Sequence, residues 1–305
     1  MRLPSNVAGA VADWKGDGGK LWFDALPNTI AAAERRWGIN IGTPYEPGGY
    51  TSYVAPAVTE KGAEVVYKCT IPHDEAIGEA DALVAYHGDG AVHLSESNPD
   101  AYELLMERCI PGADLWSVDE DAGRIEVATG LMGRLWRDVT SENISMLTSV
   151  SPRWADVTER RLITCRPPWV LGPIERGIDL LRTLPFDAEY SVLLHGDLHP
   201  GNILAAKREP WLVIDPKPMA GDPAFEPIQL LVQAGGRTTE PPSPADLEQS
   251  LADLATRLNL DAERIGLWAI ARCSEWSMWS LDHNAVAEAA LEHSWARTLD
   301  EIIPL

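Results

Sequence analysis

The stretch LLHGDLHPGNIL, residues 193–204, sets two histidines, an aspartate and an asparagine between apolar ends. Polar side chains enclosed by apolar runs are either hydrogen bonded inside a fold or kept for chemistry. The apolar start is typical of a strand, HGDLHPGN follows as a loop, and a second predicted strand, 210–215, ends in an acid. We therefore expect a hairpin-like unit that brings the side chains of Asp197, Asn202 and Asp215 close together at one end.

The side chains of this unit have a spacing with chemical meaning. In H-x-D-x-x-x-x-N, which begins at His195, Asp197 can accept a proton from a hydroxyl while Asn202 holds a metal. Asp215 would then hold the metal that bridges phosphates, and such oxygen ligands suit Mg²⁺. The alternative is a polar turn whose Asp and Asn cap backbone groups.

The spacing H-x-D-x-x-x-x-N followed by a second acid is the arrangement that kinases use for phosphoryl transfer. The other parts of such a site occur earlier in the chain, in the expected order. Lys68 in VVYKCT lies inside an apolar strand run and could hold phosphates, although a strand lysine is usually an exposed edge residue. Glu75 and Glu79, four residues apart on the following helix, could pair with it. The turn EPGGYTSY, which contains Ser52, precedes the lysine and would cover the phosphates; a plain Gly-Gly turn is the alternative.

The order of predicted elements indicates an α+β chain in two lobes. Three strands, one helix and two strands come first, and LLMERCIPG then leads into a mainly helical part. We expect an N-terminal nucleotide-binding lobe over 1–109 and a C-terminal catalytic and acceptor-binding lobe over 110–305. The predicted helices of the second lobe cover 117–137, 151–163, 173–184, 244–258, 261–281 and 284–302. A loop over 235–249 ends in a helix start with Ser243 or Asp246 as its cap.

Composition excludes several classes of protein. The 305 residues carry 25 basic and 46 acidic side chains, a net charge of -21, which argues against nucleic acid and is compatible with a cationic partner. Without an apolar run of membrane length or a signal-peptide core near the start, we expect a cytoplasmic protein with no membrane partner. The 4 cysteines match no metal or redox spacing and are predicted to be buried small hydrophobes.

The sequence lacks the residues that other catalytic motifs require. A P-loop would need glycine and Ser or Thr where WKGDGGKL has Trp14 and Leu21. The chain contains no G-x-S-x-G nucleophile elbow and no H-E-x-x-H zinc motif. His199 has no second histidine or cysteine at ligand spacing, so a zinc site there is disfavoured.

At this point the sequence resembles the aminoglycoside phosphotransferase family of the kinase-like fold, within it the group of streptomycin 6-phosphotransferases and hydroxyurea phosphotransferases. The resemblance covers about residues 40–282 and is carried by LHGDLHPGNIL, REPWLVIDPKPMAGDPAFE, ALVAYHGDGAVHL and LLMERCIPGADL. It implies a bilobal protein-kinase-like fold with a small N-terminal β-sheet lobe, one crossing helix and a larger helical lobe. It also implies ATP and Mg²⁺ as cofactors.

The resemblance implies roles for individual residues. Asp197 would be the catalytic base, Asn202 and Asp215 would bind Mg²⁺, and Lys68 would bind the phosphates of ATP with Glu79 as its partner. The remaining residues would contact the nucleotide or brace the catalytic loop: Ser52, Glu107, Arg108 and Cys109 for the nucleotide, His195 and Asp222 for the loop.

Two departures from eukaryotic protein kinases point to a small acceptor. The motif is His-Gly-Asp, without the arginine that binds a phosphorylated activation loop in protein kinases. In addition, proline follows Asp215 in place of Phe-Gly. We therefore expect a small hydroxyl-bearing substrate and no protein substrate.

A cationic acceptor would need carboxylates and aromatic faces. The late helix RCSEWSMWSLDHN offers Glu275, Trp279 and Asp282 on one face, with Trp276 beside them. The alternative is that both tryptophans belong to the core and both acids face water.

Three functions stay open at this point. The leading hypothesis is an ATP-dependent kinase that phosphorylates a streptomycin-like aminoglycoside and so confers resistance. The second is a housekeeping kinase of an amino sugar or another small metabolite. The third is an inactive kinase-like nucleotide-binding protein, which the complete set of Lys68, Asp197, Asn202 and Asp215 disfavours.

Overall fold

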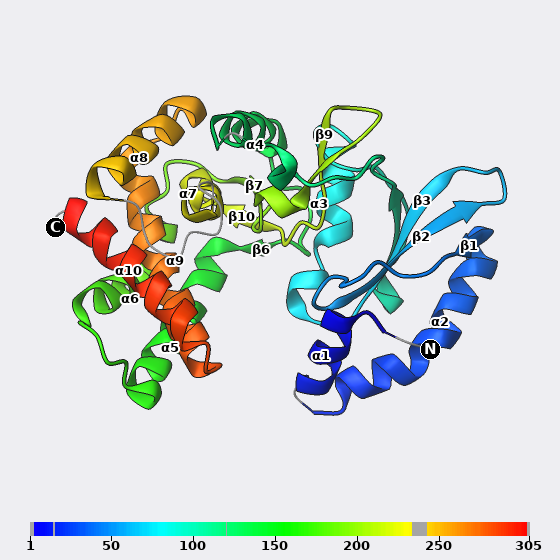
Figure 1. The fold of residues 1–305 in the computed structure, drawn as a ribbon, viewed down its shortest axis with the longest axis horizontal. Coiled ribbons are helices and arrows are strands. Elements are labelled where there is room, and N and C mark those ends of the chain that lie inside the picture. Colours follow the sequence, from blue (N-terminus) through cyan, green and yellow to red (C-terminus); the bar gives the residue numbers. More distant parts are fainter. Residues whose placement is uncertain (1–2, 15, 120, 234–242, 304–305) are drawn as a thin grey trace. The chain divides into compact units, whose positions relative to one another are not determined.

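The protein is described by a computed structural model that covers residues 3–14, 16–119, 121–233 and 243–303. The chain forms two compact units (Figure 1). The first unit comprises Met1–Ala113 and Leu204–Lys217, and the second comprises Asp114–Ile203 and Pro218–Leu305. The expected division after residue 109 lies near the first of these boundaries, but it did not assign Leu204–Lys217 to the first unit.

The first unit is built on a five-stranded antiparallel sheet in the order β1-β2-β3-β5-β4. Its strands are β1 (Ile39–Ile41), β2 (Ser52–Thr59), β3 (Glu64–Thr70), β4 (Leu94–Asn98) and β5 (Glu103–Glu107). Its helices are α1 (Ser5–Asp13), α2 (Gly18–Trp37) and α3 (Glu79–Tyr86). The predicted succession of three strands, a helix and two strands is confirmed, and α1 and α2 precede it.

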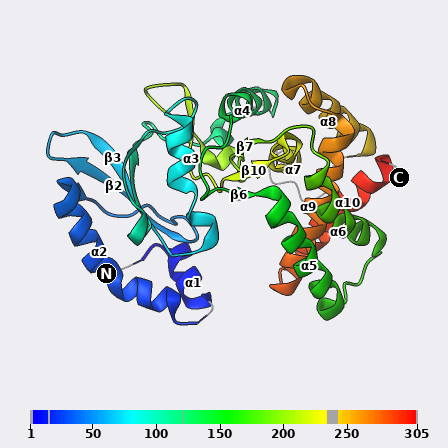
Figure 2. The ribbon, with the colours of Figure 1, turned by 180° about the vertical axis from the view of Figure 1, so that it is seen from behind.

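The two faces of this sheet serve different purposes. Successive side chains of a strand point to opposite faces. On β3, Val65, Tyr67 and Cys69 enter a core that also contains Leu26 and Ala33 of α2. The intervening Lys68 must therefore face the other side, where α3 lies (Figure 2). Because β3 is the central strand, Lys68 is buried and is not an edge residue.

The segment 204–217 belongs to the first unit because backbone bonds attach it there. Strands β8 (Ile203–Ala205) and β9 (Trp211–Val213) pair with each other. The Val213 N–H donates to Gly90 O at 2.9 Å, and the Val92 N–H donates to Val213 O at 3.0 Å. Asp215, two residues beyond β9, is thereby placed in the same unit as Lys68.

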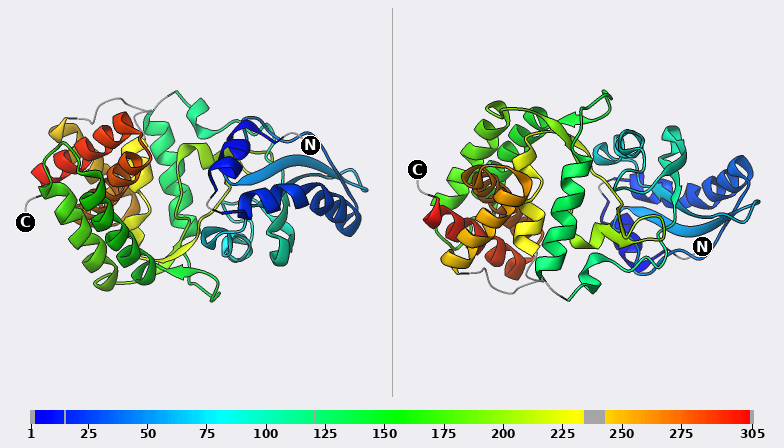
Figure 3. Two further views of the ribbon diagram at one scale, coloured as in Figure 1. Left: turned by 90° about the horizontal axis from the view of Figure 1, so that it is seen from below. Right: turned by 90° about the horizontal axis from the view of Figure 1, so that it is seen from above.

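The second unit is mainly helical, as predicted. Figure 3 shows α9 surrounded by other helices, and it packs on α5, α6, α8 and α10. The helices are α4 (Asp121–Leu135), α5 (Leu147–Cys165), α6 (Gly172–Thr183), α7 (Ile228–Gln233), α8 (Pro244–Leu258), α9 (Ala262–Asp282) and α10 (Val286–Ile302). Ser243 caps α8 and accepts from the Asp246 N–H at 3.3 Å. The predicted loop before this cap lies largely outside the described residues.

The strand pairing around the motif differs from the expected hairpin. Strand β7 (Val192–Leu194) pairs antiparallel with β10 (Met219–Gly221), which also pairs with β6 (Ser145–Met146). β9 pairs with β8 instead. The prediction that the strand before the motif and the strand before Asp215 form one hairpin is therefore wrong, because the run after Asp215 supplies the partner of β7.

The cysteines are all free. Cys69 and Cys273 are buried, as predicted, whereas Cys109 and Cys165 are only partly buried. The prediction of four buried cysteines is thus half correct.

Candidate active site

A buried ammonium group is the main feature of the first unit. Lys68 Nζ lies 2.6 Å from Glu79 Oε1 and 2.7 Å from Glu79 Oε2. It also contacts Asp215 Oδ1. Lys68 and Glu79 are 5% and 4% exposed, so neither charge could persist there alone. Of the two glutamates considered as partners of Lys68, Glu79, which the resemblance implies, makes the contact, whereas Glu75 is exposed in the short turn before α3.

The protonation of this group follows from its contacts. Burial lowers the pKa of Lys68, but the carboxylates of Asp215 and Glu79 outweigh it and raise that pKa above its ordinary value. Burial raises the pKa of Glu79 to about 7, although Lys68 pulls it down. With two carboxylates against its Nζ, Lys68 is held as an ammonium ion.

Asp215 differs from Glu79 in its access to solvent. Its side chain is 45% exposed, against 5% for that of Glu79. Its backbone adopts φ +60°, a conformation that is uncommon for a non-glycine residue. A carboxylate that contacts Lys68 while it keeps an exposed side is suited to bind a further cation.

The turn expected to cover the phosphates contacts the start of the chain. The Asn6 N–H donates to Pro47 O at 3.1 Å, and Asn6 Nδ2 donates to Gly48 O at 3.1 Å. Gly48 has φ +77°, which favours glycine. Ser52 lies at the start of β2, where its buried hydroxyl is 2.9 Å from Thr70 Oγ1. The Ser52 hydroxyl therefore has a structural partner within the sheet.

The segment expected to contact adenine has its side chains engaged with protein groups. Arg208 Nε donates to both carboxylate oxygens of Glu107, at 3.0 and 3.1 Å, and Arg108 Nη1 donates to Glu64 at 2.9 Å. Burial raises the pKa of the Cys109 thiol to about 11, so it is not a reactive thiolate. With these side chains engaged, a main-chain contact is the kind of adenine contact that this segment could offer.

In the second unit, one buried carboxylate holds the backbone of the catalytic motif. The His195 N–H donates to Glu226 Oε2 at 2.6 Å, and the Gly196 N–H donates to Glu226 Oε1 at 3.0 Å. Gly196 has φ +79°, a left-handed conformation that glycine adopts readily. Burial raises the pKa of Glu226 to about 7, against the two amide donors that lower it. Sequence reasoning missed Glu226, whose signal was an acid inside the apolar run AFEPIQLL.

Asp197 is held at its main chain and at its side chain. Its N–H donates to His195 Nδ1 at 3.2 Å, and its carbonyl oxygen accepts from Asn202 Nδ2 at 2.9 Å. One carboxylate oxygen, Oδ1, accepts from Gln229 Nε2 at 3.1 Å. Because Asn202 uses its amide nitrogen in this way, its carbonyl oxygen is the atom suited to a metal. His195 Nδ1 accepts this bond within the loop, which is compatible with the bracing role that the resemblance implies.

Asp222 forms hydrogen bonds to its own segment and to α9. Its Oδ1 accepts from the Ala224 N–H at 3.0 Å, and its Oδ2 accepts from Arg264 Nε at 2.5 Å and Trp268 Nε1 at 2.6 Å. Arg264 and Trp268 belong to α9. The side chain of Asp222 is thus bonded to α9, and the bracing of the catalytic loop by Asp222 stays a prediction, whereas Glu226 bonds the loop backbone directly.

The predicted acceptor residues on α9 lie in a set of ion pairs. Glu275 is 8% exposed and lies 3.1 Å from Arg272 Nη1 and 3.8 Å from Arg161 Nη1. Asp282 accepts from Arg161 Nε at 3.1 Å. Trp279 is 48% exposed and stacks on His283. The buried Glu275 does not match an open acceptor site. The alternative of two core tryptophans and two acids that face water does not match either, because Trp279 is exposed and Glu275 is buried.

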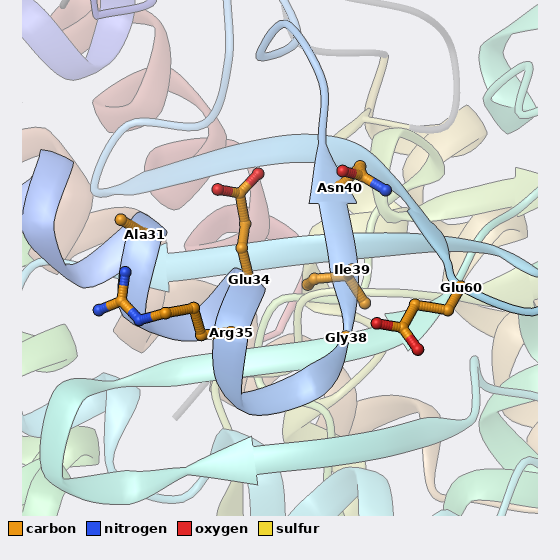
Figure 4. A pocket seen from close by; sticks show the side chains of 7 residues that line it. All are labelled: Ala31, Glu34, Arg35, Gly38, Ile39, Asn40 and Glu60. Atoms are coloured by element: carbon orange, nitrogen blue, oxygen red, sulfur yellow. The ribbon is translucent and has the colours of Figure 1, made fainter.

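A separate surface pocket of about 310 Å³ lies in the first unit, and Figure 4 shows the residues around it. It is lined by Ala31, Glu34, Arg35, Gly38, Ile39, Asn40 and Glu60. None of the predicted site residues lines it. Within the described ranges there is no cluster of three or more His, Cys, Asp or Glu side chains that could hold a metal. No helix of the described chain is long and apolar enough to cross a membrane.

Solved structures define the class of fold. A choline kinase from Streptococcus pneumoniae matches 90% of this chain and 99% of its own, with a TM-score of 0.63 and 12% identity. A thermostable mutant of an aminoglycoside phosphotransferase, in a ternary complex with ADP and hygromycin B, matches 92% of this chain and 98% of its own, with a TM-score of 0.62 and 14% identity. The predicted bilobal kinase-like fold is confirmed.

The family follows from the sequence comparisons. Residues 39–284 match the family described as aminoglycoside/hydroxyurea antibiotic resistance kinase, and the chain belongs to this family. A hydroxyurea phosphotransferase of Kitasatospora aureofaciens is 33% identical over 98% of this chain and 86% of its own length. A streptomycin 6-kinase of Streptomyces glaucescens is 28% identical over 94% of this chain and 93% of its own length. The protein is thus a phosphotransferase of an antibiotic-resistance family, as the sequence predicts.

Proposed function

We propose that this protein transfers the γ-phosphate of ATP to a hydroxyl group of streptomycin or a closely similar aminoglycoside. The observation that carries the proposal is the buried Lys68 ammonium, held between Glu79 and the half-exposed Asp215. A fixed cation beside an acid that remains accessible is what binding of metal-complexed phosphates requires. A catalytically inactive member would be expected to lack part of this set or of the His195–Asn202 loop.

In this proposal each residue performs one task. Lys68 neutralises and orients phosphate oxygens, and Glu79 keeps it in place. Asp197 accepts the proton of the acceptor hydroxyl as the oxygen attacks phosphorus, while its backbone is held by His195 and Asn202. Proton removal by a positioned carboxylate contributes about 10²–10⁴-fold to rates. The main chain of Glu107–Cys109 would contact adenine.

Mg²⁺ fits the oxygens that are present. Asn202 offers an amide oxygen and Asp215 a carboxylate, and hard oxygen ligands that leave room for phosphates are what this ion prefers. We propose Asn202 and Asp215 as the residues that would hold it. The ion supplies neutralisation of phosphate charge when bound.

Streptomycin is placed first because Asp282 and Trp279, on the same helix as the buried Glu275, offer a half-exposed carboxylate and a half-exposed aromatic ring for guanidinium groups. Hydroxyurea is the second candidate. It is favoured by the 33% identical relative and by the pairing of both acids with Arg161, which reduces their attraction for a cationic acceptor.

The deciding experiment incubates the protein with magnesium-ATP and a panel of streptomycin, hydroxyurea, other aminoglycosides and amino sugars. Each acceptor is then examined by mass spectrometry for added phosphate. A phosphorylated streptomycin is the expected product. Product with hydroxyurea alone would support the second candidate, product with an amino sugar alone would indicate a metabolic kinase, and ATP binding without product would indicate an inactive relative.

A further inference from the structure

Two glutamines of α7 form a chain of hydrogen bonds that ends on Asp197. Gln233 Nε2 donates to Gln229 Oε1 at 2.6 Å, and Gln229 Nε2 donates to Asp197 Oδ1 at 3.1 Å. The glutamines are four residues apart on one helix, which puts them on the same face. All three side chains belong to partly buried residues of the second unit. No sequence motif singled out either glutamine.

The order of donors along this chain fixes its direction. A glutamine amide has one acceptor oxygen and one donor nitrogen, and either could face a neighbour. Because Gln233 occupies the carbonyl oxygen of Gln229, the amino group of Gln229 is the end that faces Asp197. The contact is therefore a donor directed at a carboxylate, a charge-assisted bond that is stronger than a neutral one.

The bond acts on the side chain of Asp197, whereas the loop bonds described above hold its main chain. His195 and Asn202 bond the main-chain N–H and carbonyl of Asp197. Gln229 bonds its side chain, at Oδ1. The bond from Gln229 restricts the orientation of the Asp197 carboxylate, which is the group that accepts the proton in the proposed reaction.

We propose that Gln229 is a positioning residue for phosphoryl transfer and that Gln233 orients its amide. The inference rests on the proposed function, in which Asp197 is the base. In that reaction the acceptor oxygen forms a bond to the γ-phosphorus and its proton passes to the Asp197 carboxylate. The bond from the γ-phosphorus to the β–γ bridging oxygen breaks, and ADP leaves with that oxygen.

The first test replaces Gln229 by leucine, which has a similar size and no amide. The kcat with streptomycin and magnesium-ATP should fall by about tenfold, the effect of one hydrogen bond to a charged group. KM for ATP and streptomycin should stay within about twofold, because Gln229 orients the base and does not bind substrate. Gln249→Leu, at an exposed position of α8, is the matched control and should behave as the parent.

The second test separates positioning from a general structural effect by double-mutant cycles. Gln229→Leu should have no further effect on the residual turnover of Asp197→Asn. Gln233→Leu should lower kcat by about threefold, as expected for a neutral hydrogen bond, and have no effect once Gln229 is leucine.

Parental kcat in Gln229→Leu, or an equal fall in the Asp197→Asn background, would overturn the proposal. A different failure is near-normal turnover of Asp197→Asn itself. That result would remove Asp197 as the base, and with it both the assigned mechanism and the role of Gln229.

Discussion

Two buried glutamates illustrate how differently the two units hold their functional residues. Glu79 in the first unit contacts the ammonium group of Lys68, so one side chain fixes another. Glu226 in the second unit accepts from the N–H groups of His195 and Gly196, so a side chain fixes the main chain. The pKa of each carboxyl is raised to about 7, because burial outweighs the hydrogen-bond donors that lower it.

The difference has consequences for how substitutions should act. A residue that fixes another side chain affects one charge, and its effect should depend on whether that charge is present. A residue that fixes a loop backbone affects everything that the loop carries, and its loss leaves buried N–H groups without an acceptor. The predictions below test this distinction, starting with the residue that the loop presents.

The largest effect should follow Asp197→Asn. The change keeps the size of the side chain and removes the proton acceptor, so kcat should fall by about 10²-fold or more while ATP affinity changes little. Turnover is measured with streptomycin, and ATP binding by calorimetry. Asp179→Asn, at an exposed site on α6, is the matched control. Near-normal kcat in Asp197→Asn would show that this carboxylate is not the base.

Next in size should be Glu226→Ala. Two N–H groups, one buried and one partly buried, lose their acceptor, which costs about 2 kcal/mol or more in the free energy of unfolding, measured by urea denaturation. The loop is no longer held, so kcat should fall as well. Glu248→Ala, at an exposed position on α8, should change neither quantity. Unchanged stability in Glu226→Ala would mean that other acceptors replace the carboxylate. Glu226 would then not be needed to hold the loop backbone, and its proposed difference from Glu79 would be wrong.

The pair in the first unit should give a smaller and coupled effect. Lys68→Ala should lower kcat/KM for ATP by roughly 10- to 10²-fold, as for a lost charge-assisted bond. Glu79→Ala should act through Lys68, so the double variant should be less impaired than the product of the two single effects. Lys61→Ala and Glu75→Ala are exposed controls. Strictly independent effects of Lys68 and Glu79 would show that their contact does not serve nucleotide binding.

The same contrast explains what the sequence could predict. Lys68 and Asp197 could be predicted from the sequence. A lysine inside an apolar strand run can bind phosphates, and the aspartate of H-x-D-x-x-x-x-N can accept a proton. Glu226 and Gln229 could not be predicted, because they act through contacts that form only when the segment after β10 folds back onto the motif. The role of Asp222 was taken from the family resemblance, and its partners Arg264 and Trp268 on a helix about forty residues later could not be foreseen from the sequence.

Pairing of the strands was also beyond the sequence. β7 and β9 both end next to functional residues, and this similarity suggested a hairpin. Strands of three residues carry too short a pattern to specify a partner. β10, with the sequence MAG, has no strand signal of its own and yet pairs with β7. The fold class could be predicted, because it depends on the order of strands and helices, whereas the pairing depends on the tertiary fold.

The smallest expected effect concerns the acceptor. Glu275→Gln combined with Asp282→Asn should raise KM for streptomycin by about tenfold, or about 1.4 kcal/mol, and leave KM for ATP unchanged. The reason is that a cationic acceptor would compete with Arg161 for these two carboxylates. Since both acids already have a cation, their net attraction is weaker than that of unpaired acids, which limits the effect. Glu248→Gln, on the exposed face of α8, is the control.

Salt and a neutral acceptor make this last prediction sharper. Added salt screens charges that are exposed to solvent, so it should weaken streptomycin binding more in the parent than in the double variant. Hydroxyurea carries no charge, so its KM should be the same in both proteins. An equal streptomycin KM in parent and double variant would assign Glu275 and Asp282 to the internal pairing of α5 with α9. The acceptor would then have to be recognised by other residues, and the neutral candidate would be favoured.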